Sequence, residues 1–366
     1  MPKHWLLMDN ADGGGGQFRT RLAGAGRHLP ATTLTTEDLM SATAHRTRID
    51  LERLTGIHER RVSVGEEDSF SLATSAARNC LDTAQCDPES IDVVINCSIT
   101  KLRDGMTQRM EPSMASSVAH AIGAGNAMTF DLSNACAGML SGVTVLNNWI
   151  RQGTVRRGLV VSGEYISQLD WNAARHVRNI ISKELASLTL GDAGAALLLE
   201  RANPDSAGIT LAGFTTLAGY SRLCLAYPKG SDPGARMFTD SRGIQKAAIL
   251  NTPLLLREVM ETVGISMQDI DHVITHQTSA RAIRKGMKAV TTAFGSAPRN
   301  PAVITVDRYG NTASTTHTVA LVEELEAGHI RPGATIALIA LASGLEIGIV
   351  LLTVDEDLVK RYGHGN

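Results

Sequence analysis

Apolar and β-branched runs alternate along the chain with stretches in which apolar positions recur at helical spacing. The runs predict four strands in the first part of the chain: Val93–Cys97, Met128–Leu132, Gly158–Gly163 and Ala193–Glu200. They predict four more in the second part: His272–Thr275, Ala302–Val306, Thr335–Leu341 and Ile347–Val354. Amphipathic helices are predicted over Ser71–Cys86 and Thr252–Val263. Alternation of this kind favours mostly parallel sheets with helices packed on their faces.

The same landmarks occur twice in the same order. They form three pairs, namely Asp92 with Asp271, Asp131 with Asp307, and Gly158 with Gly333. The second copy follows the first by about 175 to 180 residues, which is far longer than a solenoid repeat and indicates a duplicated α/β half-domain. We therefore expect a flexible N-terminal lead at 1–17, a first half at 18–201, a polar connection or insertion at 202–242, and a second half at 243–366.

Composition narrows the class of protein. The 366 residues are 43% hydrophobic and 20% charged, which is enough apolar material for a large core. A net charge of −2 gives no reason to expect a nucleic-acid partner. The five cysteines are scattered without metal-ligand spacing, so we expect reduced thiols and no metal. No apolar run has the length of a signal peptide or a membrane span, and we expect a soluble, cytoplasmic protein.

Cys136 is the first candidate for chemistry. It lies in FDLSNACAGM, where a predicted strand ends and a helical pattern begins among small residues. A thiol at a helix N-terminus is favoured as thiolate, and free backbone N–H groups there can face a developing oxyanion. The alternative is a small buried hydrophobic residue, which is what most cysteines are.

Two residues of the second half occupy similar turns. His276 follows the predicted strand His272–Thr275 and precedes a helix near Ser279, and Asn311 lies in a glycine-containing turn before another helix. Each alone also suits a helix cap or a turn. In a duplicated fold, however, strand ends from both halves can meet in one cleft, where a Cys, a His and an Asn can serve as nucleophile, base and orienting donor.

Six motifs, in this order, resemble those of the β-ketoacyl-[acyl-carrier-protein] synthase III branch of the thiolase superfamily. They extend from about Gly24 to Val354 and read TGIHERR, EPSMASSVAHAIG, FDLSNACAGM, GDAGAALLLE, THQTSARAI and YGNTAS. The resemblance implies a thiolase-like α/β fold with five αβαβα layers, acyl-CoA or acyl-carrier-protein substrates, and no metal or redox cofactor. It implies a homodimer, with a heterodimer of homologues as the alternative.

The resemblance also assigns roles. It implies that Cys136 takes the acyl group, while His276 and Asn311 activate the incoming donor and stabilise its enolate. The backbone N–H groups of Cys136 and of the turn around Gly344 would form the oxyanion hole. Three departures concern the way coenzyme A binds: RTRIDLERL lacks the aromatic residue that stacks on its adenine, HQTS replaces HQAN, and LASGLEIG replaces a glycine-rich turn.

The fourth departure is Glu111, which stands before Pro112 where relatives usually carry an apolar side chain that reaches into the partner's acyl pocket. A glutamate there resembles the subgroup that joins two fatty acyl thioesters head to head without decarboxylation, together with the related α-pyrone and resorcinol synthases. By that likeness Glu111 removes the α-proton of the second acyl chain, a task for which a poorly solvated carboxyl is suited. A solvated loop glutamate is the alternative.

A cluster of basic residues follows His276 at helical spacing: Arg281, Arg284, Lys285 and Lys288. A basic helix face near the tunnel mouth would suit an acidic carrier protein or the phosphates of coenzyme A. A solvated basic face is the alternative.

The preferred function is a Claisen condensation of two acyl thioesters. Three alternatives stay open: decarboxylative condensation with malonyl-ACP, acyl transfer to an alcohol or amine, and a non-catalytic subunit that shapes a partner's pocket. A papain-like Cys–His–Asn hydrolase does not fit the duplicated α/β pattern. The sequence does not define the length of the acyl chain.

Overall fold

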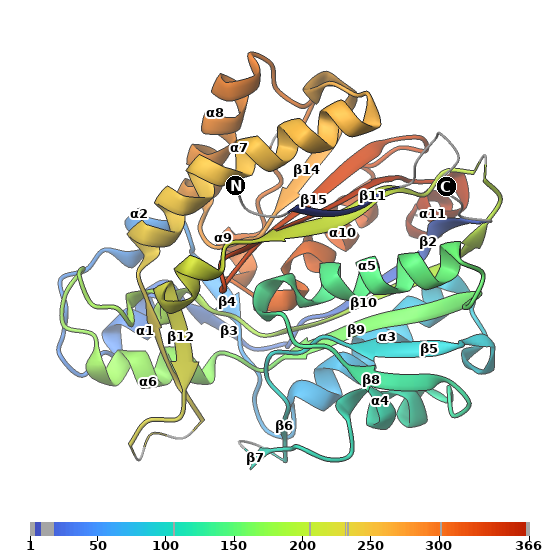
Figure 1. Ribbon diagram of the computed structural model, residues 1–366. Coiled ribbons are helices and arrows are strands. Elements are labelled where there is room, and N and C mark those ends of the chain that lie inside the picture. Colours follow the sequence, from blue (N-terminus) through green and yellow to red (C-terminus); the bar gives the residue numbers. More distant parts are fainter. Residues whose placement is uncertain are drawn as a thin grey trace.

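Two five-stranded sheets form the framework of the molecule (Figure 1). The computed structural model describes residues 4–8, 18–104, 107–204, 206–230, 232, 234–300 and 302–363, so the run Gly13–Gly16 lies outside it. The first sheet contains, in spatial order, β2 (Arg19–His28), β10 (Ala193–Ala202), β9 (Arg157–Glu164), β5 (Val93–Asn96) and β8 (Met128–Asp131). The second contains β1 (His4–Met8), β11 (Ile209–Thr216), β16 (Glu346–Thr353), β15 (Thr335–Ala342) and β14 (His272–Thr275).

Helices fill the space between the sheets and cover their outer faces. The middle layer consists of α5 (Gly138–Arg151) and α10 (Thr316–Glu326), whose apolar side chains share one core with strands of both sheets. The first sheet is covered by α3 (Ser69–Ala84) and α4 (Met114–Ile122), and the second by α7 (Ser241–Val263) and α8 (Ala280–Phe294). Figure 1 shows these five αβαβα layers, as expected from the sequence. The expected thiolase-like architecture is thus confirmed.

The duplication is visible in the topology. Strand order β2-β10-β9-β5 in the first sheet is matched by β11-β16-β15-β14 in the second. Helices correspond in the same way, with α5 preceding β9 and α10 preceding β15. The remaining strand of each sheet breaks the match, because β8 has no ladder-forming counterpart among the described residues and β1 is added beside β11.

The prediction of mostly parallel sheets was wrong. Only β5 with β8, β5 with β9, and β14 with β15 pair in parallel, while five other pairs of these sheets are antiparallel. A continuous apolar strand indicates that both of its faces are buried. The helical layers bury both faces of these sheets whether the strands are parallel or antiparallel. Direction depends on the connections, and the turn between β15 and β16 is a tight hairpin.

The predicted strand Ala302–Val306 is also absent. Residues 302–305 have no regular secondary structure, and Val306 begins α9 (Val306–Tyr309). The buried Gln277 side chain explains this difference: its Oε1 accepts the N–H groups of Thr305 (2.9 Å) and Val306 (3.2 Å), and its Nε2 donates to Val303 O (3.0 Å). A side chain therefore satisfies the backbone that a neighbouring strand would otherwise pair.

Two of the expected boundaries changed. His4–Met8 is a strand paired antiparallel with β11, so these five residues are not a flexible lead. The expected connection 202–242 contains β11, a buried strand of the second sheet, and the excursion proper is the hairpin of β12 (Cys224–Tyr227) and β13 (Arg236–Thr239). Helix α7 begins at Ser241, well before the predicted Thr252, because Asp240 caps its N-terminus by accepting the Gly243 N–H.

Smaller elements surround the layers. Two further two-stranded sheets pair β3 (Thr33–Thr35) with β4 (Glu59–Arg61), and β6 (Leu102–Arg103) with β7 (Thr107–Gln108), the second pair being a hairpin. Short helices are α1 (Thr36–Ser41), α2 (Leu51–Thr55), α6 (Gln168–His176) and α11 (Glu356–Tyr362).

Candidate active site

Cys136 lies where the first half turns from β8 into the central helix α5. A short 3₁₀ turn, Ala135–Ala137, precedes the helix, and Ala135 adopts a left-handed φ of 44°. Cys136 packs against a small apolar cluster that consists of Ile166, Leu169, Leu190 and Ala313. Cys136 is thus held at the N-terminal end of α5, as the sequence predicted.

Asn311 lies in the equivalent turn of the second half. A 3₁₀ turn, Ala313–Thr315, precedes α10, and Ala313 has a φ of 53° like Ala135. The Asn311 N–H donates to Thr189 O (2.8 Å), and its Oδ1 accepts the Ala313 N–H (3.0 Å). Within the described residues, the side-chain amide nitrogen Nδ2 of Asn311 donates no hydrogen bond, so it is able to donate one to an oxygen of a bound substrate.

The two turns contact each other between the sheets. Leu190 forms a bridge with Asn311 and lies with Ala313 in the cluster that holds Cys136. The nucleophile candidate and Asn311 therefore come from opposite halves of the chain to one place.

His276 directly follows β14 and is only 4% exposed. Its N–H donates to Ile339 O (2.9 Å), and its Nδ1 has no hydrogen-bond partner. His317, at the start of α10, lies with its ring centroid 6.0 Å away and pairs through Nε2 with the same carbonyl (3.0 Å). Burial, with a smaller effect of His317, lowers the pKa of His276 to about 3. The imidazole is therefore neutral near pH 7, and its ring N–H can donate a hydrogen bond.

Cys136 differs electrostatically from the expectation. Burial raises the pKa of its thiol, and the neighbouring Cys224 and Glu164 raise it further. The expected stabilisation of a thiolate is wrong for this structure, because loss of solvation outweighs the N–H groups at the start of α5. A neutral thiol must lose its proton as its sulfur attacks a carbonyl.

Glu164 is a buried carboxylate for which no motif or spacing predicted a role in the site. It lies at the end of β9, is fully buried, and accepts the N–H groups of Ile99 (2.9 Å) and Thr100 (3.2 Å) and the hydroxyl of Ser314. Ser314 occupies the position in its 3₁₀ turn that Cys136 occupies in the other. Burial raises the pKa of Glu164 to about 6 despite these donors.

Glu111 is exposed at the end of the segment that carries the β6–β7 hairpin. The adjacent Met110 is 85% exposed, and Lys101 anchors the hairpin to β8 through Asp131 (2.7 Å). Within the described residues, no hydrogen bond or ion pair joins Glu111 to the turn of Cys136. The exposed position of Glu111 leaves it accessible to a second subunit.

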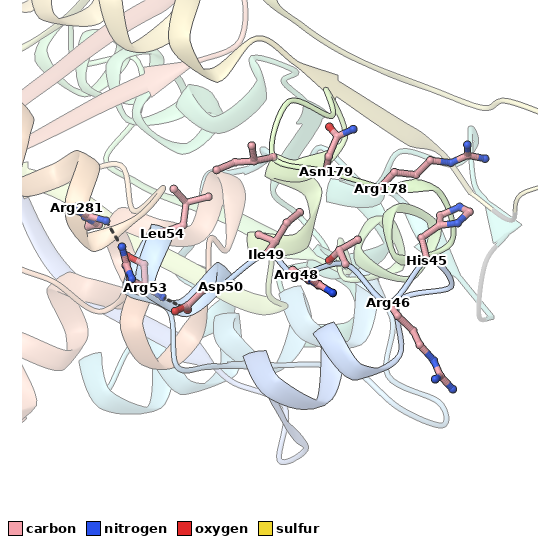
Figure 2. A pocket seen from close by; sticks show the side chains of 12 residues that line it. His45, Arg46, Arg48, Ile49, Asp50, Arg53, Leu54, Arg178, Asn179 and Arg281 are labelled. Atoms are coloured by element: carbon pink, nitrogen blue, oxygen red, sulfur yellow. Dashed lines mark hydrogen bonds between the residues drawn. The ribbon is translucent and has the colours of Figure 1, made fainter.

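The basic helix face contributes one of its four residues to a cavity of about 680 Å³ (Figure 2). Arg281 lines the cavity and donates to Arg53 O (2.9 Å), whereas Arg284, Lys285 and Lys288 are not among its lining residues. The other walls carry Arg46, Arg48, Arg53 and Arg178. Three of these belong to RTRIDLERL, so the segment that lacks an aromatic residue supplies arginines instead. The three arginines of this segment come close to Arg178 and Arg281 only in the folded protein, and no pattern in the sequence indicates that they do.

Comparison with protein families gives two matches. The family model of 3-oxoacyl-[acyl-carrier-protein] synthase III matches residues 130–216, and that of its C-terminal part matches residues 260–354. A β-ketoacyl-[acyl-carrier-protein] synthase III from Sphingopyxis alaskensis is 29% identical over 343 residues, covering 92% of this chain and 99% of its own. The enzyme of that name from Erythrobacter litoralis is 27% identical over 340 residues, with the same coverage.

Solved structures of OleA from Xanthomonas campestris have the same fold. A variant substituted at a glutamate superposes with a TM-score of 0.79 at 26% identity, covering 93% of this chain and 100% of that one. A variant substituted at a cysteine, with bound lauric acid and lauroyl-CoA, has a TM-score of 0.79 at 25% identity, covering 92% and 99%. None of the helices in the described part of the chain combines the length and hydropathy that a bilayer crossing requires.

Proposed function

Because this chain belongs to the β-ketoacyl-[acyl-carrier-protein] synthase III branch of the thiolase superfamily, a branch of condensing acyltransferases, we propose that it joins two acyl thioesters without decarboxylation. Cys136 is the nucleophile, His276 and Asn311 bind and polarise the donor, and Glu111 of the partner subunit is the base. The observation that carries the proposal is the contact between the Cys136 and Asn311 turns, together with a buried, neutral His276 next to the start of α10, the helix that follows the Asn311 turn.

The first step is acyl transfer to Cys136. The sulfur attacks the thioester carbonyl, the carbon–sulfur bond to the carrier breaks, and the carrier thiol leaves with the proton that the Cys136 thiol gives up. Backbone N–H groups of Cys136 and Gly344 stabilise the tetrahedral oxyanion. The raised pKa of the Cys136 thiol makes proton transfer part of this step, and the proton passes to the carrier sulfur as the carbon–sulfur bond breaks.

The second step forms the carbon–carbon bond. A carboxylate takes the α-proton of the second acyl thioester, and the enolate oxygen is stabilised by the imidazole of His276 and the side-chain N–H of Asn311. The enolate carbon attacks the acyl carbonyl on Cys136, the sulfur leaves, and a β-ketoacyl thioester results. The proton that the carboxylate removed is then returned to the Cys136 sulfur, so that both groups are restored. Nothing in this scheme needs a carboxylate to leave the donor.

Glu111 supplies that base in the proposal. Solved OleA variants are substituted at a glutamate, a cysteine and a histidine. These follow one another in the same chain order, and at nearly the same spacing, as Glu111, Cys136 and His276. The exposure of Glu111 beside the highly exposed Met110 supports a role in a second subunit's pocket rather than in its own.

The arginine-lined cavity is proposed to receive the phosphates of coenzyme A or of the carrier protein's prosthetic arm. Guanidinium groups bind phosphate through paired, charge-assisted hydrogen bonds. Five arginines on three separate segments surround the space, and the coenzyme would be held by charge where relatives stack its adenine on an aromatic ring.

The test is product analysis by mass spectrometry with decanoyl-CoA, with and without malonyl-ACP. Wild type is expected to form a β-keto product from decanoyl-CoA alone, and Glu111→Ala should lower its rate at least about 100-fold. Gln108→Ala, at an exposed position of β7 in the same hairpin, is the matched control and should keep wild-type activity. Acyl-Cys136 should still form in Glu111→Ala, because the base acts in the second step.

Other results would assign a different reaction. Product that requires malonyl-ACP and survives Glu111→Ala would identify a decarboxylative synthase. An acyl ester or amide formed only when an alcohol or amine is supplied would identify acyl transfer without a new carbon–carbon bond. Absence of acyl-Cys136 under all conditions would contradict the nucleophile assignment.

A further inference from the structure

Glu346 is a buried carboxylate to which the proposed mechanism assigns no step. It belongs to the run LASGLEIG, is the first residue of β16, and is 5% exposed. Its backbone pairs with Ala342 across the hairpin and with Thr216 of β11. Burying a carboxylate at a strand position costs free energy that an apolar residue would not. Stability of the sheet therefore does not explain a glutamate here.

Its partner is Asn134 of the first half. Glu346 Oε1 accepts a hydrogen bond from the side-chain amide nitrogen Nδ2 of Asn134 at 2.6 Å, and the same nitrogen donates to Ser141 Oγ on α5 at 2.7 Å. Within the described residues, no ion pair neutralises the carboxylate. Burial raises the pKa of Glu346, and the Asn134 amide lowers it again in part.

The hydrogen bond joins the two backbone segments that carry the proposed oxyanion hole. Asn134 stands two residues before Cys136, and Glu346 two residues after Gly344. The turn around Cys136 packs on β15 and β16, the two strands of the hairpin that contains Gly344. Gly344 has a φ of 143°, which favours glycine, so this turn has a specific shape that the hydrogen bond ties to the nucleophile.

We propose that Glu346 is a positioning residue that, through Asn134, fixes the separation between the N–H groups of Cys136 and Gly344. The inference rests on the proposed function, because it takes those two N–H groups as the oxyanion hole. The two N–H donors come from different halves of the chain. A hydrogen bond between Asn134 and Glu346, each two residues from one of the donors, can therefore hold the donors at a constant distance. A misplacement of about 1 Å in an active site can cost about 100-fold in rate.

The experiment is rapid-quench acylation by decanoyl-CoA, followed by mass spectrometry of the intact protein. Glu346→Ala should lower the maximal rate of Cys136 acylation about 10- to 100-fold and change the half-saturating concentration less than about threefold. Glu346→Gln keeps an oxygen that accepts from Asn134, and should remain within about threefold of wild type. Ser141→Ala, which removes the other partner of Asn134, is the matched control and should acylate like wild type.

Alkylation of Cys136 by iodoacetamide separates positioning from folding. This reaction needs the sulfur but no oxyanion hole, so Glu346→Ala should alkylate within about twofold of wild type. A wild-type acylation rate in Glu346→Ala would overturn the proposal. Equal losses of acylation and alkylation would overturn it too, because they would show that the turn itself had collapsed.

A double variant gives an independent check. If both residues act through one hydrogen bond, Glu346→Ala combined with Asn134→Ala should be no slower than the slower single variant, whereas multiplied effects would contradict the link. Wild type that fails to react with decanoyl-CoA would count against the proposed substrate, not against Glu346. The same comparison would then use p-nitrophenyl hexanoate, an activated ester whose carbonyl needs the same two donors.

Discussion

At the scale of single residues, burial dominates the charge state of the site. Desolvation raises the pKa values of Cys136 and Glu164 and lowers that of His276, in each case as the largest cause. Near pH 7 the Cys136 thiol and the His276 imidazole are therefore neutral, whereas the Glu164 carboxyl is mostly ionised because its pKa is about 6. Glu164 is the group whose titration falls nearest to neutral pH.

Glu164 should make the free energy of unfolding depend on pH. Its pKa is about 6 when folded, against an ordinary value of 4.5, so the unfolded chain releases this proton first as pH rises. Its contribution to stability is therefore fully present below about pH 4.5 and falls by about 2 kcal/mol as pH passes 6. Urea unfolding of wild type and Glu164→Gln across pH 4 to 8 measures the difference, in which other titrations cancel.

The exposed Glu66→Gln is the control for this comparison. Its difference from wild type should stay flat over the same range. If the Glu164→Gln difference is equally flat, Glu164 does not titrate where its burial implies.

At the scale of elements, the Gln277 side chain takes the place of a strand. The buried side-chain amide of Gln277 forms hydrogen bonds with three backbone groups of residues 303–306. These residues therefore do not form a strand, and the chain continues into α9 and Asn311. Gln277 also follows His276 directly. One side chain thus braces the backbone beside two of the proposed catalytic residues.

Gln277→Ala should therefore destabilise the protein and impair the site together. Two buried N–H groups and the carbonyls of Thr275 and Val303 would lose their partner, at a cost of about 3 kcal/mol. Urea unfolding measures this loss, and single-turnover kinetics should show slower condensation. Gln245→Ala, which removes only an exposed bond to Lys285 (3.2 Å), should change stability by less than about 0.5 kcal/mol. Comparable losses in the two variants would show that Gln277 has no special bracing role.

At the scale of the whole molecule, the arginine cavity exists only because distant segments meet. Residues 45–54, residues 178–180 and Arg281 of α8 form its walls (Figure 2). Basic residues elsewhere on α8 have the same charge but do not line this space. Position, rather than net basicity, should therefore decide which arginines matter for binding.

Arg281→Ala is expected to raise the KM for acyl-CoA about three- to tenfold with little change in kcat, because it removes one charge-assisted contact to phosphate. Arg284→Ala, on the same helix but outside the cavity, should leave KM near wild type. Steady-state kinetics at low salt and at about 0.5 M salt should show the difference shrinking as charges are screened. Equal effects of the two substitutions would favour general electrostatic attraction over a defined phosphate site.

Most of the individual elements could be predicted from local pattern. Seven of the eight predicted strands exist within a few residues of the expected bounds, and Cys136, His276 and Asn311 do lie in turns between strands or loops and helices. Strand direction could not be predicted, since apolar runs report burial alone. The eighth strand failed because Gln277, distant in sequence, satisfies its backbone.

By itself the sequence determined the periodicities, the duplication and the motifs that mark the family, because each is a property of residues close in the chain or repeated along it. Only the tertiary structure decided that the turns of Cys136 and Asn311 touch, that Asn134 meets Glu346, and that arginines from three segments share one cavity. Such contacts join residues of opposite halves, and the pKa values of the site follow from the burial that those contacts produce. The spacing of residues along the chain and their composition do not reveal these contacts, because segments far apart in the sequence come together only when the chain folds.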